Sequence, residues 1–88
     1  MRVETHPKFD RLFRKRIATN RKLTQLFKNR LAMFRNNPTH PLLHDHQLTG
    51  KKQGLRSFSI TGDIRVVYRK ISSNIVILLD IGSHAQVY

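Results

Sequence analysis

The C-terminal residues IGSHAQVY hold two side chains that could do chemistry, the imidazole of His84 and the phenol of Tyr88. An imidazole is the side chain best suited to exchanging protons near neutral pH. His84 follows an apolar run that looks like a strand, so the histidine would stand where that strand ends. An ordinary surface histidine would give the same pattern, and both interpretations stay open at this point.

Two arginines and a phenylalanine form a second candidate site. If Thr61-Gly62 is a two-residue hairpin loop, Phe58 pairs with Arg65, and Arg56 shares their face because side chains alternate along a strand. Guanidinium groups bind phosphate with two parallel hydrogen bonds, and an exposed aromatic ring can stack on a splayed base. We therefore expect an RNA-binding face, although arginines that merely solvate a sheet would look alike.

The loop before this hairpin contains most of the histidines. His40, His44 and His46 are spaced H-x3-H-x-H, which lacks the regular geometry of known metal sites, so we expect neither a metal nor a cofactor. Lys51 and Lys52 follow in the same loop. They are either a solvated pair or contacts to RNA phosphates.

These side chains must be positioned by a small sheet and two helices. Apolar residues at helical spacing predict a helix that begins near His6-Pro7 and a second one, capped by Thr19 or Asn20, that stops at Asn36-Asn37-Pro38. A period of two then predicts strands. We expect one α+β domain over residues 1–88, in the order β-α-α-β-β-β, with the helices packed on one face of an antiparallel sheet. The predicted strands are residues 1–5, 55–60, 63–70 and 75–81, with Val87-Tyr88 as a possible edge strand.

The charge points to a polyanionic partner. The 88 residues carry 17 Lys and Arg against 5 Asp and Glu, a net charge of +12. Most of the excess lies in residues 1–36, which carry eleven basic and two acidic side chains. Nucleic acid is the first partner to consider for so basic a domain. The N-terminus lacks the apolar run of a signal peptide, and no apolar run is long enough to cross a membrane, so we expect a cytoplasmic protein.

Four short motifs in order resemble the RelE/ParE toxin superfamily, and within it the RelE and YafQ-like branch. The basic helices and the opening HPKFDRLF fit the same branch. The resemblance covers nearly the whole chain. The motifs are His46-x-Leu48-x-Gly50, Gly54-x-Arg56, Gly62-Asp63-x-Arg65-x-Val67-Tyr68 and Ile81-Gly82-x-His84-x-x-Val87-Tyr88.

The resemblance implies the toxin of a type II toxin–antitoxin system, a RelE-like fold and a ribosome-dependent endoribonuclease. Such a toxin cuts mRNA in the ribosomal A site without a metal, through attack of a ribose 2′-OH on the adjacent phosphate. This chemistry needs a base, an acid and cations for the developing charge. Relatives often carry an acidic residue where this chain has Ala85, and some carry a catalytic histidine at Ser59 or a tryptophan at Ile64, so the resemblance does not fix the acid/base pair.

The resemblance also suggests roles for individual residues. His84 matches the general acid, and His46 or Asp63 the base. Arg65 and Arg56 match cations at the phosphate, and Tyr88 matches the terminal aromatic that stacks on or orients the nucleotide. Further RNA contacts are expected from Phe58, Lys51, Lys52 and the basic helices, represented by Lys15 and Arg16.

The implied partners are the ribosome with its rRNA and mRNA, and an antitoxin with an acidic binding segment. The toxin–antitoxin complex would be hetero-oligomeric and would bind operator DNA through the antitoxin. Two alternatives remain: a non-nuclease toxin that inhibits DNA gyrase, as in the ParE branch, and a plain basic RNA-binding module.

Overall fold

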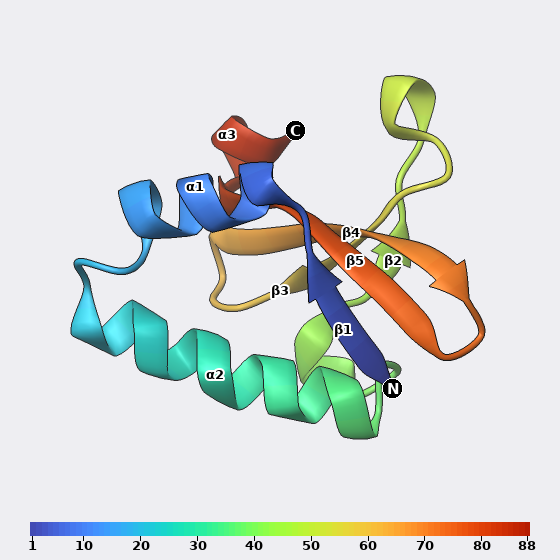
Figure 1. Cartoon of the computed structure of the whole chain (residues 1–88), viewed down its shortest axis with the longest axis horizontal. Helices are drawn as coiled ribbons and strands as arrows, with labels where there is room; N and C mark the ends of the chain where they lie inside the picture. The colour runs from blue at the N-terminus through green and yellow to red at the C-terminus, as the bar shows by residue number, and fades with distance from the viewer.

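A computed structural model describes all residues, 1–88, and shows an α+β fold in which helices cover a five-stranded sheet. The strand order is β1-β5-β4-β3-β2. Helix α2 lies below the sheet in Figure 1 and the short helix α3 lies above it. The elements are β1 (Arg2–Thr5), α1 (Pro7–Arg16), α2 (Arg21–Asn36), β2 (His46–Gln47), β3 (Arg56–Ser59), β4 (Ile64–Ser72), β5 (Ile75–Ser83) and α3 (His84–Val87), with 3₁₀ turns at Pro41–Leu43 and Gly50–Lys52.

The two N-terminal helices begin where the sequence predicts. Pro7 occupies the first turn of α1, and Nδ1 of His6 accepts a hydrogen bond from the N–H of Lys8 at 3.0 Å. Asn20 caps α2 by accepting from the N–H of Leu23 at 3.0 Å. Each cap satisfies one of the backbone donors that a helix N-terminus leaves free.

The main core lies between the helices and one face of the sheet. Phe34 of α2 stacks on Phe58 of β3 with ring centroids 4.4 Å apart, and meets Tyr68 of β4 edge-on at 4.9 Å. Phe9 and Ile17 of α1 belong to the same buried cluster. Burial of such large aromatic rings removes much apolar surface from water, which matters in a domain with a core this small.

The sheet is mixed, which corrects the prediction of an antiparallel sheet. β1 runs parallel to β5, with Arg2 opposite Ile75 and Thr5 opposite Leu78, whereas the remaining neighbours are antiparallel. A parallel pair needs a long crossover connection, and the α1–α2 hairpin with the later strands supplies it. The two-residue strand β2 also escaped prediction because it is too short for a period of two to show.

The hairpin between β3 and β4 has a longer loop than predicted. Ser59 pairs with Arg65 and Phe58 with Val66, so residues Ile60–Asp63 form the connection. The hydroxyl of Thr61 accepts from the N–H groups of Asp63 and Ile64, which holds the wider loop closed. This one-residue change of register moves each β3 side chain to the opposite face from the one expected.

The C-terminus forms a helix and not the predicted edge strand. Ser83 and Gln86 form a capping box: the Ser83 hydroxyl accepts from the Gln86 N–H at 3.3 Å, and Gln86 Oε1 accepts from the Ser83 N–H at 2.8 Å. Val87 packs on Val67, Leu48 and Leu55, on the face of the sheet away from α2. None of the helices is long and apolar enough to span a membrane.

Candidate functional site

Helix α3 brings His84 and Tyr88 together. One turn separates them, and the N–H of Tyr88 donates to the carbonyl of His84 at 3.1 Å. Their rings meet edge to face, with centroids 4.5 Å apart and planes at 82°. The Tyr88 hydroxyl hydrogen-bonds the hydroxyl of Ser57 on β3, which fixes the ring while leaving Tyr88 40% exposed.

His46 joins this pair from β2, an element far from α3 along the chain. Its ring lies 6.5 Å from the ring of Tyr88, centroid to centroid. The three residues line an open hollow of about 570 Å³ in which the other charged side chains are both basic. The lining is His46, Gln47, Leu48, Thr49, Lys51, Lys52, His84 and Tyr88.

The hydrogen bond of His46 determines which of its nitrogens is free. Nδ1 lies 2.9 Å from the carbonyl oxygen of His44. A carbonyl can only accept, so Nδ1 carries the proton, and in the neutral ring Nε2 keeps its lone pair. His46 is thus arranged as a proton acceptor.

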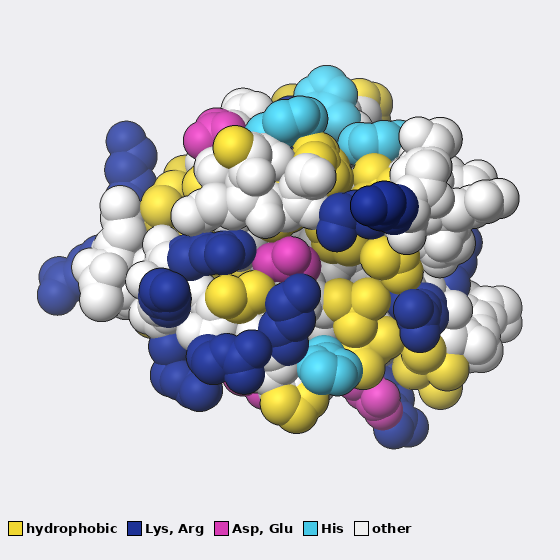
Figure 2. Space-filling model, turned by 90° about the horizontal axis from the view of Figure 1, so that it is seen from above, with side chains coloured by type: hydrophobic (Ala, Val, Ile, Leu, Met, Phe, Trp, Pro, Cys, Tyr) yellow, Lys and Arg dark blue, Asp and Glu magenta, His cyan; other side chains and the backbone are white.

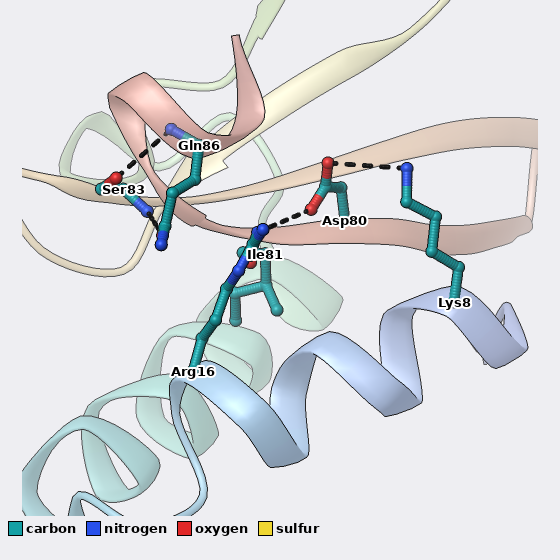
Figure 3. Close-up of polar contacts among 6 residues, drawn as sticks. All are labelled: Lys8, Arg16, Asp80, Ile81, Ser83 and Gln86. Atoms are coloured by element: carbon teal, nitrogen blue, oxygen red, sulfur yellow. Dashed lines mark hydrogen bonds and ion pairs between the residues drawn. The ribbon is translucent and has the colours of Figure 1, made fainter.

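Two separate sets of polar contacts flank Gly82: the capping box between Ser83 and Gln86, and the contacts of Arg16 and Lys8 with β5 (Figure 3). Arg16, at the end of α1, donates to the carbonyl of Ile81 at 2.9 Å and lies 3.4 Å from Asp80, which also faces Lys8 at 3.9 Å. β1 pairs with β5 only as far as Leu78, so Arg16 satisfies a carbonyl on the uncovered part of β5. A Cβ at Gly82 would stand 2.6 Å from Gln86 Oε1 and 2.8 Å from Arg16 Nη1. Gly82 therefore allows these two side chains to approach the backbone closely, within a strand that continues to Ser83.

Arg65 lies on the same sheet face as the hollow but does not line it. Its Nη1 donates to the Ser59 hydroxyl and to the carbonyl of Thr61 at 3.3 Å. Asp63, the alternative base, is also outside the hollow, where Oδ1 accepts from the backbone N–H of His84 at 3.3 Å. Asp63 thus supports the first turn of α3.

Arg56 lies on the opposite face from Arg65, which corrects the expected arginine pair. Its guanidinium donates to Asp45 Oδ1 from Nε at 2.8 Å and from Nη2 at 2.7 Å, and the Tyr68 hydroxyl donates to Oδ2 at 2.6 Å. The Asp45 side chain is 7% exposed. Burial alone would lower the pKa of Arg56, but the hydrogen bond and charge of Asp45 outweigh it and raise that pKa. Burial, followed by the contact with Asp45, raises the pKa of Tyr68.

Phe58 is fully buried at 0% exposure, so it cannot stack on a base as predicted. The reason is the hairpin register, which turns its ring towards Phe34 of α2. Of the two residues taken to represent the basic helices, Lys15 is exposed, whereas Arg16 is engaged at β5. Lys51 and Lys52 lie in the hollow.

Figure 2 shows the face that carries α3, with most of its histidine side chains at the upper edge and lysines and arginines spread over the rest of the face. No group of three His, Asp or Glu side chains is arranged to hold a metal ion. His40 instead caps the turn Pro41–Leu43, where Nδ1 accepts from the N–H of Leu42 at 3.1 Å.

Sequence reasoning missed two residues that organise the site. Asp45 orders the loop that carries His46, and its signal was a lone acid flanked by two histidines. Gln86 fixes α3, and its signal was the S-x-x-Q pattern at Ser83, which is a helix-start signature.

Solved structures with the same fold support the topology along the whole chain. A copper-bound mutant toxin from Helicobacter pylori shares 26% identity and a TM-score of 0.80, covering 100% of this chain and 99% of that one. YafQ from Escherichia coli BL21(DE3) has 20% identity, the same coverage and a TM-score of 0.80. YafQ in the E. coli DinJ–YafQ complex has 20% identity, the same coverage and a TM-score of 0.79.

No curated protein matches the sequence. A protein family does, over residues 1–88, and it is described as the bacterial toxin of a type II toxin–antitoxin system, YafQ. The match confirms the branch indicated by the four motifs. The chain belongs to the YafQ family of type II toxins.

Proposed function

We propose that this toxin is a ribosome-dependent endoribonuclease that cuts mRNA in the A site. The observation that carries the proposal is the convergence of His46 and His84 on the ring of Tyr88 in a hollow whose other charged residues are lysines. Two imidazoles on either side of one site supply a base and an acid for the same phosphate.

In the proposed reaction, Nε2 of His46 takes the proton of the ribose 2′-OH. The oxygen forms a bond to the adjacent phosphorus, and the bond from phosphorus to the 5′-oxygen breaks. Protonated His84 gives its proton to that leaving oxygen. The products are a 2′,3′-cyclic phosphate and a 5′-hydroxyl, and no metal is required.

The remaining residues of the hollow bind and orient. Lys51 and Lys52 stabilise the negative charge that grows on the phosphate oxygens. Tyr88, whose ring is anchored through Ser57, stacks on or orients the nucleotide. Asp63 and Arg56 act on the protein itself, through α3 and through Asp45, and not on the RNA.

The proposed partners follow from charge and from the family. E. coli YafQ is found in a complex with DinJ, and we extend this to an antitoxin whose acidic segment covers the basic surface of the present chain. The resulting complex would be hetero-oligomeric and bind operator DNA through the antitoxin. Co-expression with the neighbouring reading frame tests this, and a toxin that purifies alone and does not inhibit growth would count against it.

The nuclease proposal is tested by primer extension on mRNA from translating ribosomes. Removing a general acid or base should slow cleavage by roughly 10²–10⁴-fold in His84→Ala and in His46→Ala. His6→Asn is the matched control, because it removes a histidine outside the hollow and keeps a good N-cap for α1. If the wild type cuts no mRNA, and His84→Ala inhibits growth as strongly as the wild type, a gyrase inhibitor or a plain RNA-binding module replaces this proposal.

A further inference from the structure

A second hollow of about 510 Å³ lies beyond the edge of β3, on the hairpin side. β2 pairs only with Arg56 and Ser57, so the end of β3 has no neighbouring strand there. Three cationic or ionisable side chains line this hollow, and no acidic side chain does. They are Arg30 of α2, His44 of the loop before β2, and Arg65 of β4.

The two arginines are free to bind an anion. Neither Arg30 nor Arg65 forms an ion pair. Both hydrogen bonds of Arg65 use Nη1, which leaves Nε and Nη2 without a protein partner. Arg30 makes only a 4.0 Å contact to the sulfur of Met33. Two unpaired guanidinium groups around a hollow are suited to a phosphate, which they bind with paired hydrogen bonds.

This hollow is next to the one that holds His46, His84 and Tyr88. Ser57, which bonds Tyr88, and Ser59, which bonds Arg65, lie two residues apart on the same face of β3. Such positions are about 7 Å apart along a strand. Neighbouring phosphates of an extended RNA strand have a comparable separation.

We propose that Arg30, His44 and Arg65 form a subsite for the RNA phosphodiester next to the scissile one. The inference rests on the proposed function and changes the role of Arg65, which the sequence placed at the scissile phosphate. In this arrangement the lysines and histidines of the first hollow bind the scissile phosphate. The subsite holds the strand in register while the histidines act on the adjacent linkage.

The test measures binding and cleavage separately. Binding uses a single-stranded RNA oligonucleotide with a 2′-deoxy nucleotide at the cleavage position, so that it cannot be cut. Arg30→Gln should weaken binding about tenfold, as expected for a charge-assisted contact, and reduce the salt slope by about 0.7. Lys28→Gln is the matched control, because it removes an exposed charge from the same helix outside both hollows. His44→Asn, which suits the left-handed backbone at φ 47°, should also weaken binding.

A methylphosphonate linkage next to the cleavage position identifies the phosphate involved. It should weaken binding to the wild type but add little to the loss in Arg30→Gln. At subsaturating toxin, the single-turnover cleavage rate on ribosomes should fall in Arg30→Gln by about the factor lost in binding, whereas Lys28→Gln should keep the wild-type rate. Equal affinity losses in these two variants, or no RNA binding by the wild type, would each overturn the subsite. Loss of cleavage with Arg30-dependent binding intact would instead refute the nuclease and leave the subsite standing.

Discussion

Gly82 is the position where one methyl group should disturb the site most. In Gly82→Ala the new Cβ would stand 2.6 Å from Gln86 Oε1 and 2.8 Å from Arg16 Nη1. Both atoms lie at the ends of flexible side chains, so they can move away from the new Cβ, but each would then lose a hydrogen bond. Gln86 would lose the Ser83 N–H at 2.8 Å, and Arg16 would lose the carbonyl of Ile81 at 2.9 Å.

The cost of Gly82→Ala follows from these two bonds. Losing one side of a helix cap costs about 1 kcal/mol, and losing a hydrogen bond from a partly exposed charged group about 1 kcal/mol more. Replacing glycine by alanine also lowers the conformational entropy of the unfolded chain, which offsets ~0.4–1 kcal/mol of this loss. The free energy of unfolding should therefore fall by about 1–2 kcal/mol. Cleavage should fall further, because Gln86 holds the helix that carries His84 and Tyr88.

Urea unfolding followed by circular dichroism measures the loss by linear extrapolation. Gly62→Ala is the matched control, because a Cβ there meets nothing within 4 Å. A double-mutant cycle with Gln86→Ala identifies the contact: the two losses should sum to more than the loss in the double variant. A Gly82→Ala protein as stable as Gly62→Ala, or fully additive losses, would refute this reasoning.

Three further predictions concern residues behind the site. The raised pKa of Tyr68 means that the folded state favours the protonated phenol, so this stability is complete below about pH 10 and is lost as pH rises further. The free energy of unfolding should therefore fall between about pH 8 and about pH 11 in the wild type, and it should fall less in Tyr68→Phe, which has no phenol to titrate. Asp45→Asn should lower the unfolding free energy by about 1–3 kcal/mol, below the cost of a fully buried pair, because Arg56 is 32% exposed; an unchanged urea midpoint would contradict this. Phe58→Leu should lower stability by ~1–2 kcal/mol without changing RNA affinity, whereas weakened RNA binding at unchanged stability would restore a stacking role.

The helices and the inner strands follow from local rules, and the sequence is sufficient to predict them. Apolar spacing and the caps at His6 and Asn20 place α1 and α2 correctly. The run Ile75 to Leu79 is apolar because β5 has a strand on each side along much of its length. Such signals depend on residues near one another in the chain, so they can be recognised without knowledge of the fold.

The face of each side chain depends on the hairpin loop, and here local rules were insufficient. Thr61-Gly62 favours a two-residue turn, but the hydroxyl of Thr61 closes a wider loop. That single difference buries Phe58 and takes Arg56 to the other side of the sheet. The positions of His46, His84 and Tyr88 were inferred from a family resemblance, since no local pattern links β2 to α3.

The capping box of α3 connects the missed helix to the chemistry. The predicted edge strand at Val87-Tyr88 would direct successive side chains to opposite faces of the sheet and would not place the rings of His84 and Tyr88 one helical turn apart. As one helical turn, they set the ring of His84 edge to face against the ring of Tyr88, which also lies 6.5 Å from the ring of His46. The S-x-x-Q signature therefore bears on the chemistry as well, because the helical turn that it starts places His84 and Tyr88 in the same hollow as His46. A variant that keeps His84 but breaks the cap, Gln86→Ala, should consequently slow cleavage while leaving the phosphate contacts of the second hollow unchanged.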